Sequence, residues 1–253
     1  MGGLIFIKLG GSAITNKSIP NSVNQQVLGQ AAKEISSVCK DYKILIGHGG
    51  GSFAHPVAEK YKVQTGLQDS GLDGFNKTRH AVEKLGKIVT DSLKSASVPA
   101  VWLSAFSCTL MKNSEITEMF ISPIEQLLES GNVLVIPGDV CMDSRQVFSI
   151  ASTEMLFTFL AKKLKPAKII IGTDVDGVLD ENNETIPEIN SSNLSSVLKK
   201  ISSSAVPDVT GGMRHKIEEL SKIGAQIQII NLKKKGILKK AILGGTVPGT
   251  AIK

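Results

Sequence analysis

The sequence predicts an α/β fold with a mainly parallel sheet. Short runs of β-branched and other apolar residues alternate along the chain with longer amphipathic segments, which is the pattern of strands joined by helical crossovers. No change in composition marks a linker and no internal repeat is visible. With 253 residues, 42% of them hydrophobic, the chain can bury a sizeable core. We therefore expect one continuous domain over residues 1–253.

Six strands are expected, in chain order, and each is a short apolar run that stops at glycine, proline or polar residues. They occupy residues 4–9, 43–46, 99–103, 133–136, 168–171 and 226–230. Six helices are expected between and around them, because apolar residues recur there at intervals of three and four. They occupy residues 25–39, 74–93, 122–128, 153–164, 194–202 and 212–223.

Composition excludes several classes of protein. Three scattered cysteines, Cys39, Cys108 and Cys141, are typical of a reduced chain, so a cytoplasmic protein is expected. No apolar run approaches the roughly 18–20 residues of a membrane span, and the N-terminus lacks the features of a signal peptide.

The net charge of +6, with a pI of about 9.1, raises the possibility of nucleic-acid binding through the lysines of residues 233–240. That segment contains no interleaved aromatic residue, and the whole chain has only three arginines, Arg79, Arg145 and Arg214. We therefore interpret this lysine cluster as solvated surface and expect no nucleic-acid partner and no membrane partner.

The first strand ends in a glycine turn beside lysines. Lys8 is followed by Leu9, Gly10, Gly11 and Ser12, and Lys17 lies five residues further on. Adjacent glycines allow backbone N–H groups to converge on an anion. A tight turn with a surface lysine is the alternative interpretation.

The second strand runs into a longer glycine loop, in which His48, Gly49, Gly50 and Gly51 precede Ser52, Phe53, Ala54 and His55. Three consecutive glycines are costly unless the backbone must approach a ligand, and a phosphate at a helix N-terminus is the usual one. The spacing is not the G-x-G-x-x-G of dinucleotide-binding folds. His55 lies where an imidazole can donate to phosphate oxygens, whereas His48 is interpreted as structural.

Two further motifs follow later strands. Asp174 and Asp176 come directly after the strand of residues 168–171, and either carboxylate could contact a ligand or simply form a turn. Thr210, Gly211 and Gly212 open the last predicted helix, with Lys216 in its first turns, which is a second arrangement suited to phosphate.

The absence of well-known motifs excludes several classes of enzyme. The sequence contains no P-loop, no protein-kinase signature and no G-x-S-x-G element of serine hydrolases. Several glycine turns with lysines beside them therefore predict phosphoryl transfer between two phosphate-bearing ligands.

Together these ordered motifs resemble the amino-acid kinase superfamily over nearly the whole chain, including the turn of residues 245–250 near the C-terminus. The resemblance implies a three-layer αβα sandwich, a substrate-binding N-terminal part, a nucleotide-binding C-terminal part, ATP and Mg²⁺ as cofactors, and a homodimer. Within the superfamily, the element G-G-G-S-F-x-H is similar to that of the isopentenyl phosphate kinase family, whereas the carboxylate kinases lack its histidine. Fosfomycin kinases share that histidine and are the nearest alternative.

The resemblance also implies roles for individual residues. Catalytic roles fall to Lys8, Lys17, His55 and Lys216. Substrate binding falls to Gly50, Gly51, His55, Gly138, Asp139 and Thr153. Nucleotide binding falls to Lys8, Gly10, Gly11, Ser12, Gly51, Asp174, Gly211, Gly212 and Lys216. The sequence does not identify the ligands of a metal ion.

The chain departs from the superfamily pattern at two places. Ala54 replaces the glycine that usually precedes the histidine, a change that would be costly at positive φ. Ser152, Thr153 and Glu154 stand where the superfamily usually has an aspartate pair. These departures keep a second hypothesis open, a ligand-binding homologue with weak or no catalysis.

Overall fold

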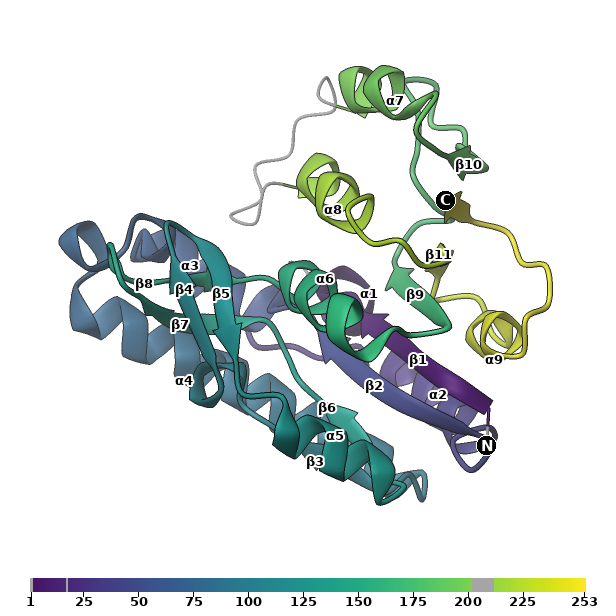
Figure 1. Cartoon of the computed structure of the whole chain (residues 1–253), viewed down its shortest axis with the longest axis horizontal. Coiled ribbons are helices and arrows are strands. Elements are labelled where there is room, and N and C mark those ends of the chain that lie inside the picture. The colour runs from purple at the N-terminus through teal and green to yellow at the C-terminus, as the bar shows by residue number, and fades with distance from the viewer. Residues whose placement is uncertain (1, 17, 202–211) are drawn as a thin grey trace.

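The structure is a computed structural model and describes residues 2–16, 18–201 and 212–253. An eight-stranded sheet forms its centre (Figure 1), in the order β10-β12-β11-β9-β1-β2-β6-β3. The strands are β1 (Gly2–Leu9), β2 (Tyr42–His48), β3 (Ala100–Trp102), β6 (Val133–Val135), β9 (Lys168–Thr173), β10 (Glu188–Ile189), β11 (Ile227–Asn231) and β12 (Thr250–Ile252). Neighbouring strands are parallel except that β12 runs antiparallel to β11.

Helices cover both faces of this sheet, so the three-layer prediction is confirmed. One face packs against α2 (Gln25–Ser36), α3 (Gly51–Lys60), α4 (Leu67–Ser95) and α9 (Ile237–Ile242). The other face packs against α5 (Ser122–Glu129), α6 (Thr153–Leu164), α7 (Leu194–Ile201) and α8 (Gly212–Leu220).

The strand residues divide between these two cores by simple alternation. Ile5 and Ile7 of β1 belong to the core beneath α2 and α4, while Phe6 between them belongs to the core beneath α6. Alternate side chains of a strand point to opposite faces, and a strand buried on both sides must therefore be apolar at consecutive positions. This is why the central strands read as continuous apolar runs in the sequence.

A second, four-stranded sheet lies beside α3 and α4 (Figure 1) and was not predicted. It contains β4 (Thr109–Lys112), β5 (Glu115–Met119), β7 (Asp139–Asp143) and β8 (Val147–Ala151) in the order β5-β4-β7-β8. Its hairpin ends are held by the buried carboxylate of Asp143. That carboxylate accepts hydrogen bonds from the backbone N–H groups of Ser114 (2.8 Å) and Arg145 (2.9 Å) and from the Ser149 hydroxyl (2.8 Å).

The six predicted strands are all present, and six of the observed helices lie where helices were predicted. The predicted helix of residues 74–93 begins earlier, at Leu67, with a break in helical geometry at Gly71, where φ is 64°. Short α1 (Gly11–Ile14), α3 and α9 were not predicted as helices, since α1 and α9 span less than two turns and α3 opens on glycine and contains Pro56. Among the described helices, none combines the length and the apolar character that a membrane crossing requires.

Candidate active site

Two glycine turns meet at the carboxyl edge of the central sheet. β1 and β2 are adjacent and parallel, so the turns that follow them lie side by side. A Cβ atom placed on Gly11 would lie only 2.5 Å from the backbone nitrogen of Gly51, and one on Gly10 would lie 2.3 Å from the carbonyl oxygen of Gly172. Only glycine allows the backbones to approach this closely, and this explains the paired glycines in both motifs.

The turn after β2 presents backbone donors. Gly51 has φ of 49°, and α3 begins there. The N–H of Ser52 donates to the Thr15 hydroxyl at 3.0 Å, and that hydroxyl donates to the carbonyl oxygen of Gly11 at 2.6 Å. Within the described parts of the chain, the N–H groups of Gly50 and Gly51 have no protein acceptor. The first turn of α3 can therefore receive an anion.

His55 lies beside this turn, one helical turn along α3. A Cβ atom on Gly50 would lie 3.0 Å from its Cδ2 atom. The ring is half-buried. His55, Gly50 and Gly51 are thus brought together as the sequence predicted. Ala54 carries no cost, because it lies inside α3 and does not have positive φ.

Lys8 and Lys216 come together around an acid that sequence reasoning missed. The Lys8 ammonium, on the buried end of β1, donates a hydrogen bond to the Glu154 carboxylate on α6. Burial raises the pKa of Glu154, but the charges of Lys8 and Lys216 and the hydrogen bond from Lys8 outweigh it, so that its pKa lies below 4.5. Glu154 is therefore ionised, and it holds two cations at the carboxyl edge of the sheet.

The available sequence signal for Glu154 was its place in the triplet that departs from the superfamily's aspartate pair. Sequence reasoning treated the residue before it, Thr153, as the replacement. The structure shows that an acidic group is present at the site, one residue later, and that it holds a lysine. An acid that holds lysines is thus present in this triplet despite the departure at Thr153.

Thr153 lies behind the glycine turn of β2. Its hydroxyl donates to the carbonyl oxygen of His48 at 2.8 Å and accepts from the N–H of Gly138 at 3.1 Å. A Cβ atom on Gly47 would lie 2.3 Å from its Cγ2 atom. Thr153 and Gly138 thus brace the end of β2 from the side opposite α3.

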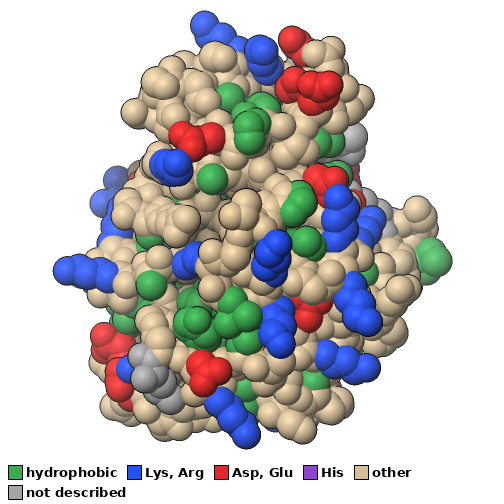
Figure 2. All heavy atoms as spheres, turned by 90° about the vertical axis from the view of Figure 1, so that its right-hand side faces the viewer, with side chains coloured by type: hydrophobic (Ala, Val, Ile, Leu, Met, Phe, Trp, Pro, Cys, Tyr) green, Lys and Arg blue, Asp and Glu red, His purple; other side chains and the backbone are tan. Residues whose placement is uncertain are grey.

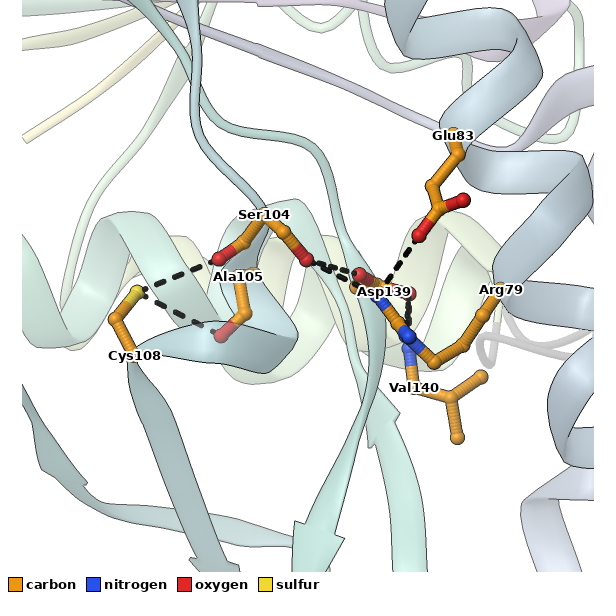
Figure 3. Close-up of polar contacts among 7 residues, drawn as sticks. All are labelled: Arg79, Glu83, Ser104, Ala105, Cys108, Asp139 and Val140. Atoms are coloured by element: carbon orange, nitrogen blue, oxygen red, sulfur yellow. Dashed lines mark hydrogen bonds and ion pairs between the residues drawn. The ribbon is translucent and has the colours of Figure 1, made fainter.

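The Asp139 carboxylate is surrounded by protein partners (Figure 3). One oxygen accepts from the Val140 N–H at 2.8 Å and lies 3.7 Å from Nε of Arg79; the other accepts from the Ser104 hydroxyl at 3.2 Å. Arg79 also donates to Glu83 at 3.0 Å and lies 3.9 Å from the centre of the Phe106 ring. Burial raises the pKa of Asp139 to about 6, against the opposing charge of Arg79 and the hydrogen bonds.

The acidic pair after β9 lies next to the lysine cluster. Lys234 donates a hydrogen bond of 2.7 Å to the Asp176 carboxylate, and this carboxylate also accepts one of 3.0 Å from the Asn231 amide. The Lys233 ammonium lies 4.0 Å from the Asp174 carboxylate. These lysines are about half exposed, as expected for solvated surface, yet they face the predicted nucleotide side rather than a separate patch.

No resident metal site is formed by the residues that the structure describes, since no three His, Cys, Asp or Glu side chains gather as ligands. Mg²⁺ needs few protein ligands when it arrives on nucleotide phosphates.

The predicted site residues occupy one edge of the sheet in two groups. Lys8, Gly10, Gly11, Ser12, Gly50, Gly51, His55 and Lys216 surround the turns after β1 and β2, and Asp174 follows β9. Gly138, Asp139 and Thr153 lie on the β6 side, bound to protein groups. Gly212 is the first residue of α8. Lys17 and Gly211 lie outside the described residues.

Comparisons with known proteins agree with this arrangement. The model of the amino acid kinase family matches residues 3–230. Isopentenyl phosphate kinases of Methanocaldococcus jannaschii and Methanothermobacter thermautotrophicus are 34% and 35% identical to the chain, and each match covers 98% of both proteins. An X-ray structure of isopentenyl phosphate kinase is 31% identical and superimposes with a TM-score of 0.84, covering 98% of this chain and 100% of the other.

Proposed function

The chain belongs to the amino acid kinase family, and from that membership we propose that it transfers the γ-phosphoryl group of ATP to isopentenyl phosphate, giving isopentenyl diphosphate and ADP. One observation carries the choice of acceptor. A histidine stands beside the glycine turn at the start of α3, in a chain whose full-length relatives bear the name isopentenyl phosphate kinase.

The acceptor phosphate is assigned to the first turn of α3. The N–H groups of Gly50 and Gly51 and the His55 ring would bind its oxygens, because an anion at a helix N-terminus meets both unused donors and the positive end of the helix dipole. The acceptor needs no general base. A phosphomonoester has a second pKa near 6 and is largely a dianion at pH 7, so its oxygen is already a nucleophile.

Lys8 and Lys216 are assigned to the phosphates of ATP. Phosphoryl transfer passes through a loose transition state with charge spread over the transferred oxygens, so the protein contributes mainly position and positive charge. Glu154 acts as a positioning residue, because its carboxylate holds the Lys8 ammonium and draws Lys216 toward it. Lys17 is proposed to contact the transferred group, and Gly10, Gly11, Ser12, Gly211, Gly212 and Asp174 to contact the nucleotide.

Mg²⁺ is proposed to enter on the ATP phosphates, where it neutralises part of their charge. We assign the residues on the β6 side, Gly138, Asp139 and Thr153, to the support of the acceptor pocket. We also propose that the protein is cytoplasmic, in keeping with its three free cysteines. We further propose that it is a homodimer, which light scattering on the purified protein tests.

The direct test is ADP release in the presence of ATP, Mg²⁺ and isopentenyl phosphate, with the diphosphate product identified by ³¹P NMR. Turnover of fosfomycin in place of isopentenyl phosphate would reject the proposed acceptor and favour the alternative kinase. ATP binding without turnover of either compound would reject catalysis.

The matched variants are His55→Ala and His55→Gln. We expect His55→Ala to raise the KM for isopentenyl phosphate at least tenfold, because a hydrogen bond to a charged oxygen is lost, while the Kd for ATP stays the same. His55→Gln, which keeps an N–H donor, should recover part of that loss. Unchanged kinetics in His55→Ala would remove His55 from the site.

A further inference from the structure

His48 is a fully buried residue that the proposed reaction does not use. It is the last residue of β2, and its ring nitrogen Nδ1 lies 3.2 Å from the carbonyl oxygen of Gly49. A carbonyl oxygen only accepts, so Nδ1 carries the proton and Nε2 is a bare lone pair. Nε2 is buried and has no hydrogen-bond partner in the parts of the chain that the structure describes.

The ring stays neutral under physiological conditions. Burial lowers the pKa of His48 to about 4, the hydrogen bond to Gly49 opposes that change, and the nearby charge of Lys8 lowers it further. A buried acceptor without a partner costs roughly 1–3 kcal/mol, which an apolar side chain would avoid. The buried imidazole therefore points to a use for its Nδ1–H.

The backbone around the ring is fixed on both sides. The carbonyl oxygen of His48 accepts from the N–H of Gly138 at 3.3 Å and from the Thr153 hydroxyl at 2.8 Å. The N–H of Gly49 donates to the carbonyl oxygen of Leu9 at 3.3 Å. The peptide group between Gly49 and Gly50 is the first part of this segment that strand pairing does not hold.

The His48 ring holds that peptide group by its oxygen. In a trans peptide the C=O and the N–H lie in one plane and point in opposite directions, so fixing the Gly49 oxygen also fixes the direction of the Gly50 N–H. Gly50 lies against His55, and its N–H has no acceptor among the described residues. Glycine at positions 49 and 50 would otherwise leave this peptide free to rotate.

We propose that His48 is a positioning residue: its Nδ1–H holds the Gly49 carbonyl and thereby aims the Gly50 N–H at the acceptor phosphate. This inference rests on the proposed function. His48 need not touch the substrate for the effect to appear in acceptor binding.

The test compares His48→Asn with His48→Gln. Asparagine places an amide N–H at the same number of bonds from Cα as Nδ1, whereas glutamine places it at the position of Nε2. We expect His48→Asn to keep the KM for isopentenyl phosphate within about threefold of wild type. His48→Gln should raise that KM roughly tenfold or more, with the KM for ATP unchanged in both.

Equal losses in both variants, or a loss that falls on ATP, would overturn the inference, because a merely structural role would not separate the two amides. If the wild-type enzyme is active and His48→Gln has unchanged kinetics, the inference about His48 is overturned while the proposed function stands. If the wild-type protein is inactive on isopentenyl phosphate, the proposed function is overturned instead.

A second measurement needs no variant. The chain has four histidines, so ¹⁵N-histidine NMR can resolve the tautomer of His48. We expect the Nδ1–H form from pH 5.5 to 8. An Nε2–H form would overturn the inference, since Nδ1 could not then donate to Gly49.

Discussion

Glu154 carries charge in a buried place only because two lysines stabilise it. Its folded pKa lies below 4.5, so it stabilises the fold above its unfolded pKa, and that contribution is lost as the pH falls through the lower folded value. We expect Glu154→Gln to be destabilised by about 3–5 kcal/mol at pH 7, because the buried Lys8 ammonium loses the carboxylate to which it donates. Urea unfolding between pH 3 and 7 should show that the variant has lost part of the acid sensitivity of the wild type.

The control is the double variant Lys8→Met with Glu154→Gln. Removing both charges leaves no buried ammonium that has lost its carboxylate, so the double variant should be more stable than Glu154→Gln alone, although inactive. Strict additivity of the two single changes would contradict the ion pair as the cause.

The raised pKa of Asp139 leads us to expect that the free energy of unfolding depends on pH with the opposite sign. Its folded pKa is about 6 against 3.8 for an ordinary aspartate, so between those values the folded protein holds a proton that the unfolded chain has released. The free energy of unfolding should therefore fall by about 2 kcal/mol as the pH rises from 4 to 6. Asp139→Asn should lack this slope in the same urea series, and a slope that persists would assign it to another group.

Local sequence pattern was enough to place the glycine turns, Lys8, His55 and Lys216 together, because their neighbours in sequence mark a strand end or a helix start. Their roles stay predictions. Glu154 was missed because its partner Lys8 lies on a strand 146 residues earlier in the sequence. No local sequence pattern indicates a buried ion pair between elements so far apart. The same holds for the Arg79–Asp139 pair.

Packing between elements gives a prediction at the next scale, that of the turns after β1 and β2. Gly11→Ala would place Cβ 2.5 Å from the backbone nitrogen of Gly51, so the two turns must move apart. We expect kcat to fall at least tenfold, because the groups that hold the two phosphates are no longer in register. The measurement is steady-state kinetics beside a thermal melt.

Gly29→Ala is the matched control. Gly29 lies in the middle of α2, and a Cβ atom there would meet nothing within 4 Å. Alanine should stabilise this helix by roughly 0.5–1 kcal/mol and leave kcat unchanged. A loss of activity in this variant would contradict the register of the two turns as the reason for the loss in Gly11→Ala.

Helices and strands were predicted well where burial produces a long, regular pattern of apolar residues. The central strands are apolar on both faces, and α2, α4, α5 and α6 carry a broad apolar stripe. The second sheet was missed because its strands are short and partly polar, and because Asp143, a single carboxylate, organises both of its hairpin ends. Hydrophobic periodicity carries no information about such a residue.

The whole molecule is held together by one sheet that runs through both the proposed acceptor side and the proposed nucleotide side. The two cores lie on opposite faces of that sheet and each spans both sides, since β1, β2, β9 and β11 contribute to both. We therefore expect a single cooperative unfolding transition in urea, with coincident curves from far-UV circular dichroism and Trp102 fluorescence. Two separated transitions would instead indicate two domains and contradict the prediction of one.

Charge is also distributed unevenly at the scale of the whole molecule. On the face shown in Figure 2, lysine and arginine side chains are spread among acidic and uncharged ones instead of forming one continuous basic surface. Lys8 and Lys216 lie with Glu154, and Lys233 and Lys234 lie near Asp174 and Asp176. The positions of the lysines, and not the net charge of +6, indicate which of them are proposed to bind phosphate.

The place of β1 in the sheet also bears on how the protein is made. β1 leaves the ribosome first and can pair early with β2, but its other neighbour is β9, where Ile5 lies opposite Lys168. At about 5–20 residues per second, synthesis leaves that apolar edge of β1 without a partner for roughly 10–30 s. During this interval the nascent chain exposes an unpaired strand edge, so chaperone binding to that edge should raise the yield of soluble protein.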